Sequence, residues 1–273
     1  MFSYKLQYSK KLRDQVGKLV KKAPAPTLLL VGPSGHGKSA FINSVSTISQ
    51  DRKSNITNCA KSANHVTPAF RKYYLQGELK GFKIADTMGV TQDTSQYVNK
   101  IVKIMNGHIK PGTKFTNEGF QTDNRENEFT DSYINAPEES DKVHCVIILL
   151  DMTTFANKSE LIKIAFKDSI QNLLTELNDL DVPRIVILTH ADKMDKNVDE
   201  NIANIFYSEK IKGIVNIVND MFGVPKENIH PIVNYAETKN AHLDYRLHIP
   251  ILLALESALI FADETLHKRR LHE

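Results

Sequence analysis

The stretch GPSGHGKS, from Gly32 to Ser39, decides the fold of this chain. It matches the pattern G-x-x-x-x-G-K-[ST], a loop whose backbone N–H groups cradle the phosphates of a nucleotide. The apolar run Leu28–Val31 before it predicts a short buried strand, and Ala40–Val45 after it predicts a helix. Such a loop needs this context, because the amino end of the helix directs its positive dipole at the phosphates. We therefore predict a phosphate-binding loop (P-loop) rather than a plain glycine-rich turn.

The composition indicates an ordinary globular protein that is 41% hydrophobic and 25% charged, with a net charge of +3. That charge is too small to predict a nucleic-acid partner. Cys59 and Cys145 are the only cysteines, so the sequence carries no disulfide framework and we expect a cytoplasmic protein. We see no transmembrane segment in the sequence and no signal peptide behind Met1.

The domain organisation is predicted to be a basic helix over residues 1–25 followed by one domain over residues 26–273. The first segment is rich in lysine, and its apolar residues recur at helical spacing. It is either an arm that touches an anionic membrane or a partner, or a helix packed on the domain with a solvated basic face. We favour the packed helix.

The rest of the chain alternates between strands and helices, which predicts a three-layer α/β fold with a mostly parallel sheet. The exception is an antiparallel edge strand, because Phe70–Gln76 and Gly81–Asp86 are joined by a tight turn. Further strands are expected at Val143–Asp151, Arg184–Thr189 and Ile229–Asn234. Helices are expected at Gln92–Asn106, Ser159–Asn178, Val198–Phe222 and, at the C-terminus, residues 249–268, with a polar insertion near residues 113–142.

A metal site is predicted where Asp86-Thr87-Met88-Gly89 closes a strand. Asp86 would hold Mg²⁺ through water, Ser39 would bind it directly, and the N–H of Gly89 would meet the γ-phosphate. A threonine is also expected between the P-loop helix and Asp86. Thr57 and Thr67 are the candidates, and we prefer Thr67 because it lies just ahead of a predicted strand.

The base of the nucleotide is predicted to lie against Thr189-His190-Ala191-Asp192, at a position where GTPases carry [NT]-K-x-D. The Asp192 carboxylate can accept both hydrogen bonds offered by guanine N1–H and the 2-amino group, a pair that adenine lacks. His190 replaces the usual lysine, and its ring could stack on guanine. The alternative is that Asp192 merely caps a helix.

A second base contact is predicted in the loop Asn234-Tyr235-Ala236. Tyr235 or Ala236 would offer a backbone N–H to guanine O6, while Asn234 buttresses the loop. On the phosphate side, the predicted binding residues are Ser34, Gly35, His36, Gly37, Lys38, Ser39, Ala40 and Gly89.

The sequence predicts only weak catalysis of GTP hydrolysis. Lys38 would stabilise charge between the β- and γ-phosphates. However, Val90 and Thr91 follow Gly89 where Ras-like enzymes carry a glutamine, and neither side chain can orient water in its way. His36 could face the γ-phosphate, reach across a homodimer of G domains, or point to solvent; we favour solvent. We expect slow hydrolysis of GTP, at a rate that self-association of the protein increases.

The motifs in this order resemble the translation-factor-like class of P-loop GTPases. Several segments further resemble the G domain of the interferon-induced protein 44 and 44-like family. The segments are Leu28–Ser39, Asp86–Gly89, Gly107-His108-Ile109, Asp141–Val146, Phe222–Pro225 and Asn234–Ala236. The resemblance implies a cytosolic G domain that binds GTP or GDP with Mg²⁺ and takes part in immune or antiviral responses.

Three functions are compatible with these motifs. The first is a GTP-binding switch with weak GTPase activity. The second is a scaffold that binds GTP without hydrolysing it and uses the bound nucleotide to order loops for a partner. The third is an ATP-dependent enzyme such as a small kinase, against which Asp192 argues.

Overall fold

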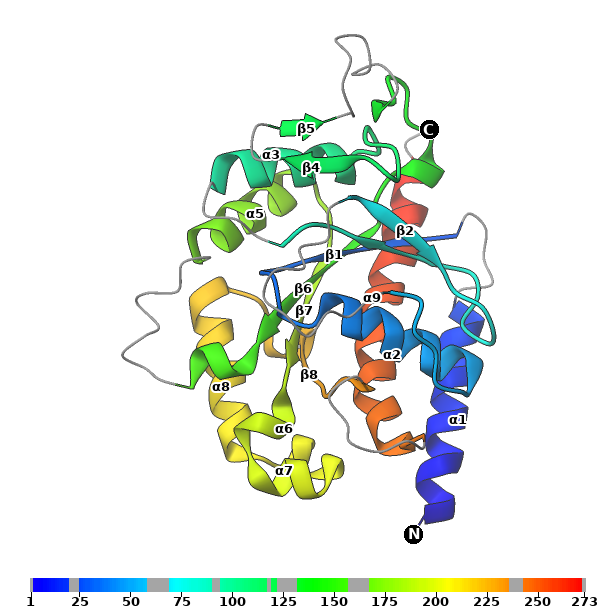
Figure 1. Ribbon diagram of the computed structural model, residues 1–273, viewed down its shortest axis with the longest axis vertical. Helices are drawn as coiled ribbons and strands as arrows, with labels where there is room; N and C mark the ends of the chain where they lie inside the picture. The colour runs from blue at the N-terminus through cyan, green and yellow to red at the C-terminus, as the bar shows by residue number, and fades with distance from the viewer. Residues whose placement is uncertain are drawn as a thin grey trace.

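We describe a computed structural model of the chain that covers residues 2–19, 25–57, 69–89, 94–116, 119–121, 132–156, 167–235 and 243–271. A six-stranded sheet with the order β2-β3-β1-β6-β7-β8 forms its centre (Figure 1). The strands are β1 (Thr27–Val31), β2 (Arg71–Tyr74), β3 (Lys83–Asp86), β6 (Cys145–Asp151), β7 (Arg184–Thr189) and β8 (Ile229–Pro231). Only β2 runs antiparallel, against β3, which confirms the predicted sheet.

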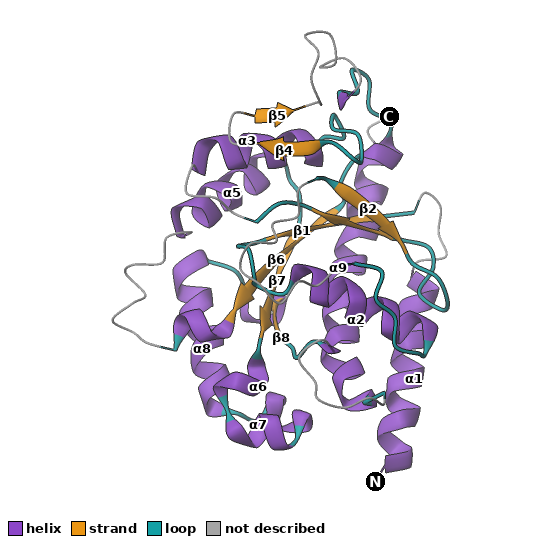
Figure 2. Ribbon diagram, in the orientation of Figure 1, coloured by secondary structure: helices purple, strands orange, loops and turns teal. Residues whose placement is uncertain are grey.

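The central strands are buried on both faces, as their near-continuous apolar sequences require. Every residue of β1 is buried, and so is every residue of β6 except Asp151. In Figure 2 the strands lie between two groups of helices. One group is α1 (Phe2–Leu19), α2 (Lys38–Gln50) and α9 (Tyr245–Leu271), and the other is α3 (Thr94–Met105), α5 (Lys167–Asp179) and α8 (Glu209–Phe222). The predicted three-layer α/β fold is therefore confirmed.

The amino-terminal helix α1 packs along α9. Its Leu12 and Val16 are buried in the core, whereas Lys10, Lys11 and Lys18 are exposed. This arrangement agrees with the packed-helix interpretation. Among the described helices, none combines the length and apolar character that a membrane crossing needs.

The predicted helix over Val198–Phe222 is wrong, because three short elements replace it. They are α7 (Lys196–Glu200), the 3₁₀ turn η4 (Ile202–Phe206) and α8. Asn201 leaves helical geometry with φ −149° and accepts the N–H of Ala203, and Ser208 accepts the N–H of Ile211. Each break is thus stabilised by a polar side chain that caps the next element.

The remaining predicted elements agree with the structure to within a few residues where it describes them. In the polar segment near 113–142, β4 (Lys114–Thr116) and β5 (Gly119–Gln121) form a separate antiparallel pair, followed by η1 (Glu139–Asp141). The other short elements are η2 (Met152–Phe155), α6 (Ala191–Met194) and η5 (Lys226–Asn228). The C-terminal helix begins at Tyr245, a few residues earlier than predicted.

Candidate nucleotide-binding site

The P-loop joins β1 to α2 through three glycines in conformations that other residues rarely adopt. Gly32, Gly35 and Gly37 have φ values of 142°, 80° and 87°. A Cβ atom on Gly32 would also lie 2.2 Å from the carbonyl oxygen of Leu149 in β6. The loop therefore requires glycine both for its backbone turns and for its close approach to the neighbouring strand.

Lys38 lies inside this loop and is only 6% exposed. Its Nζ donates hydrogen bonds to the carbonyl oxygens of Gly32, at 2.8 Å, and Pro33, at 2.9 Å. Burial lowers the pKa of Lys38 to about 8, although the nearby Asp86 carboxylate opposes this shift. An anion at this loop would therefore find a pre-positioned cation.

The amino end of α2 fits a phosphate group. The helix begins at Lys38, and its N-cap residue is Gly37, which offers no side chain to the first turn. The initial N–H groups of a helix have no partner within the helix and carry its positive dipole. The backbone N–H groups of Lys38, Ser39 and Ala40 form the first turn of this helix, where an anion would be stabilised.

The predicted metal side of the site lies at the end of β3, next to β1. Asp86 pairs in register with Leu30 and is 1% exposed. Gly89 packs against the P-loop so tightly that a Cβ atom there would lie 2.5 Å from the backbone nitrogen of Ser34. A carboxylate and the Ser39 hydroxyl are oxygen donors of the kind that Mg²⁺ prefers. The donor set thus fits this ion.

Of the two candidate threonines, Thr57 is bound to α2. It is 7% exposed, and its hydroxyl donates to the carbonyl oxygen of Ser39 at 3.0 Å. Thr67, the preferred candidate, lies outside the described residues, as do Val90 and Thr91.

The predicted base side lies at the end of β7. Thr189 is the last residue of this strand, and its hydroxyl donates to the carbonyl oxygen of His36 at 3.3 Å. Asp192 is the second residue of α6, whereas the N-cap of that helix is His190. The alternative interpretation of Asp192 as a helix cap is therefore wrong.

The ring of His190 is held at the ends of β6 and β7. Its Nδ1 lies 3.1 Å from Oδ2 of Asp151, the last residue of β6, and 3.2 Å from the Thr189 hydroxyl. The side chain is 9% exposed. His190 therefore makes an internal contact with Asp151, and the prediction that its ring covers guanine stays a prediction.

The second base loop is anchored to α2 through Ser44. The Ser44 hydroxyl donates to the Asn234 side-chain oxygen at 3.1 Å and accepts the N–H of Tyr235 at 3.0 Å. Asn234 also donates to the carbonyl oxygen of Gly37 at 3.5 Å, so it buttresses the loop as predicted. The Tyr235 N–H is therefore already engaged, and Ala236, the other predicted donor to guanine O6, lies outside the described residues.

His36 turns toward the base side of the P-loop instead of toward solvent, which corrects the favoured interpretation. Its Nδ1 accepts the backbone N–H of Asp151 at 2.9 Å. Burial lowers the pKa of His36 to about 4, against the opposing effect of Asp151. Since β3 and β6 flank β1 on opposite sides, this ring lies on the side of the P-loop away from Asp86. Its placement does not favour a catalytic role at the γ-phosphate.

Sequence reasoning missed Asp151 and Ser44. The sequence analysis placed Asp151 at the end of a predicted strand and Ser44 within a predicted helix, and it gave neither residue a role in the site. Asp151 had no local signal, because its contacts to His36 and His190 are made through the fold. The loop contacts of Ser44 likewise had no local signal, since Asn234 and Tyr235 lie more than a hundred residues away in the chain.

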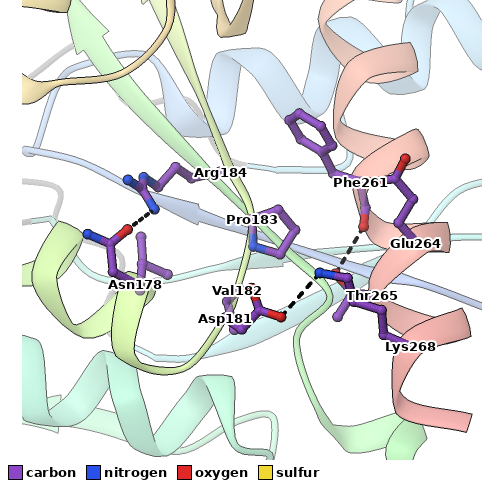
Figure 3. A pocket seen from close by; sticks show the side chains of 10 residues that line it. Asn178, Asp181, Val182, Pro183, Arg184, Phe261, Glu264, Thr265 and Lys268 are labelled. Atoms are coloured by element: carbon purple, nitrogen blue, oxygen red, sulfur yellow. Dashed lines mark hydrogen bonds and ion pairs between the residues drawn. The ribbon is translucent and has the colours of Figure 1, made fainter. Parts of the chain in front are cut away.

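A hollow lies at the opposite end of the sheet from the P-loop, between the start of β7 and α9 (Figure 3). Its cations already have partners. Arg184 donates to Asn178 at 2.6 Å, and Lys268 pairs with Asp181 at 3.2 Å. This hollow is therefore a weaker candidate for an anionic ligand than the P-loop.

The fold and the site thus combine a mostly parallel α/β sheet with a P-loop at its carboxyl edge. No protein-family model matches the chain. The chain is distantly homologous to mouse interferon-induced protein 44, with 25% identity over 88% of this chain and 55% of the relative. It is likewise 27% identical to human interferon-induced protein 44-like, over 90% of this chain and 53% of the relative. The predicted resemblance is confirmed, and the chain spans about half the length of these relatives.

Two of the solved structures that the chain resembles are GTP-binding proteins, and the similarity to both is low. The crystal structure titled "probable GTP-binding protein engB" aligns with a TM-score of 0.42 and 16% identity, over 85% of this chain and 99% of that one. A SAR1-type small GTPase from Encephalitozoon cuniculi aligns with a TM-score of 0.43 and 9% identity, over 96% of this chain and 91% of that one.

Proposed function

We propose that this chain is a guanine-nucleotide-binding module that holds GTP or GDP together with Mg²⁺. One observation carries the proposal: the P-loop with its buried Lys38, the strand end at Asp86 and the helix start at Asp192 all lie at the carboxyl edge of one sheet. Ligands of open α/β sheets bind at this edge.

Each residue has a role set by its position. Lys38 and the first N–H groups of α2 would neutralise and orient the phosphates. Ser39, Asp86 and Thr67 would hold Mg²⁺, which supplies charge neutralisation to the phosphate oxygens. Asp192 would accept hydrogen bonds from guanine N1–H and the 2-amino group, and the N–H of Ala236 would meet guanine O6.

Asp192→Asn tests the base assignment. We expect GDP affinity to fall about a hundredfold and xanthosine diphosphate to become the better ligand, because the amide cannot accept both guanine hydrogens. Asp199→Asn, on an exposed position of α7, is the matched control and should leave GDP binding unchanged. Isothermal titration with GDP, xanthosine diphosphate and ADP measures the three affinities. ADP binding as tight as GDP binding in the wild type would contradict the proposal.

GTP hydrolysis is proposed to be slow. The segment after Gly89 has no glutamine at the Ras-like position, and His36 is engaged with Asp151. The same two facts support the second candidate, a scaffold that binds GTP without turnover. Single-turnover kinetics separate the candidates, because a scaffold releases no phosphate. Turnover per protomer across a concentration series then tests the proposed homodimer, which should raise the rate.

A role in an immune or antiviral response is proposed from the names of the relatives, which are interferon-induced proteins. This chain matches only about half of their length, so the proposal concerns the G domain. Transcript levels before and after an immune challenge to the source cells would test it, and an unchanged level would count against it.

A further inference from the structure

Asp151 connects the two loops of the site. It ends β6 and lies in register beside Thr189, the last residue of β7. Its backbone N–H donates to Nδ1 of His36 in the P-loop, at 2.9 Å. Its carboxylate Oδ2 lies 3.1 Å from Nδ1 of His190 in the base loop. One residue thus contacts both the phosphate-binding and the base-binding loops.

The geometry of the carboxylate is fixed by its other oxygen. Oδ1 accepts the backbone N–H of Thr153 at 2.8 Å and its hydroxyl at 2.7 Å, which caps η2. These two bonds direct Oδ2 toward His190. Although burial acts to raise it, the hydrogen bonds from His190 and Thr153 hold the pKa of Asp151 at about 2, so the group is a carboxylate at neutral pH.

His190 needs such an anchor because its backbone is in the left-handed region, with φ 59°. A residue other than glycine adopts this conformation only when surrounding contacts hold it there. Ala191 and Asp192 follow directly and start α6, so the conformation of His190 sets where the Asp192 carboxylate lies.

From these contacts we infer that Asp151 is a positioning residue for base recognition: by holding His190 in its left-handed turn, it aligns Asp192 with the guanine edge. The inference rests on the proposed guanine site. The contact that positions the base loop is thus made by a partly buried Asp–His pair at the place where GTPases carry a lysine. The same residue fixes His36, so the P-loop and the base loop share one anchor.

The test compares Asp151→Asn with Thr153→Val. The first change removes the charge that holds His190 but keeps an oxygen for the cap of η2. The second removes one bond to Oδ1 and leaves the His190 contact intact. Affinities for GDP and inosine diphosphate are measured by titration calorimetry, because inosine lacks only the 2-amino group that Asp192 would read. Circular dichroism melts confirm that each variant is folded.

For Asp151→Asn we expect GDP affinity to fall about tenfold and the preference for GDP over inosine diphosphate to shrink several-fold. Thr153→Val should keep the wild-type preference. In an Asp192→Asn background, Asp151→Asn should not change the preference further, because the two residues act through one contact. An equal loss of affinity for both nucleotides in Asp151→Asn would overturn the inference and leave the proposed function standing. A wild type that binds no guanine nucleotide would reject both.

Discussion

Lys38 keeps its ammonium group in a nearly closed pocket of carbonyl oxygens. Desolvation of a cation is unfavourable, which is why its pKa falls to about 8. A phosphate group at the P-loop would restore a favourable environment for the charge and raise that pKa again. Nucleotide binding at this site is consequently linked to the protonation of a single lysine.

This linkage predicts a pH dependence of affinity. Below pH 8 Lys38 is already protonated and GDP affinity should be flat. Above pH 8 the free protein must take up a proton to bind, so the dissociation constant should rise by up to about tenfold per pH unit. Titration calorimetry between pH 7 and pH 9 in two buffers of different ionisation enthalpy measures both affinity and proton uptake. Lys38→Arg is the control, because arginine stays charged throughout this range. Uniform affinity across pH 8 in the wild type would refute the linkage.

At the scale of elements, the chain between β7 and β8 is divided by polar caps. Ser208 has two bonds here: it accepts the N–H of Ile211 in the first turn of α8 and donates to Oδ2 of Asp195 at 2.5 Å. Asp195 in turn accepts the N–H of Asn197 and caps α7. Ser208 thus connects the caps of two helices near the base loop.

Ser208→Ala should therefore reduce the free energy of unfolding by about 1–2 kcal/mol, since it removes a cap and leaves Asp195 with one bond fewer. Urea unfolding followed by circular dichroism measures the change. Ser257→Ala is the matched control, because Ser257 lies within α9 and bonds only to the carbonyl of Leu253, where alanine is the better helix former. Its unfolding free energy should stay the same or rise slightly. Equal effects of the two substitutions would contradict the capping role.

These caps also explain why the ends of some helices could not be predicted from the sequence. Each central strand was predictable, because a short apolar run between polar turns is a local signal. The P-loop was predictable because its glycines and lysine are adjacent in the chain. The break at Asn201 was not, since the apolar period of one long helix continues across it and only the caps oppose that period. Local periodicity therefore locates elements better than it locates their ends.

The same limit applies to the candidate site. Asp86 ends β3 and Asp192 follows β7, so the sequence could place both at one edge of the sheet, while their roles there stay predictions. The roles of His36 and Tyr235 could not be read from the sequence, because long-range contacts to Asp151 and Ser44 decide them. A motif predicts which segment of backbone reaches the site. The packed structure decides which hydrogen-bonding groups of that segment remain available to a ligand.

At the scale of the whole molecule, burial of neutral histidines connects stability to pH. Burial lowers the pKa of each of four histidines from 6.5 to about 4. They are His36, His144, His230 and His248. His144 is fully buried and shows why: its Nδ1 accepts the N–H of Thr27 at 2.9 Å, while Nε2 lies 3.1 Å from the Glu139 carboxylate. A proton on Nδ1 would break the first bond.

The sign of the effect follows from proton counts. Between pH 4 and pH 6.5 the unfolded chain binds more protons than the folded one, so the free energy of unfolding falls as the pH falls through this window. At pH 5 each such histidine costs up to about 2 kcal/mol relative to pH 7. Urea unfolding at pH 7, 6 and 5 should therefore show a loss of several kcal/mol.

His144→Asn isolates one contribution, because the amide oxygen can still accept the N–H of Thr27 but does not titrate. The variant should lose about 2 kcal/mol less than the wild type between pH 7 and pH 5, whatever its stability at neutral pH. His267→Asn, on an exposed position of α9, should lose as much as the wild type. Removing a buried neutral histidine must make the unfolding free energy less dependent on pH. If His144→Asn lost as much unfolding free energy as the wild type between pH 7 and pH 5, the acid sensitivity would come from other groups.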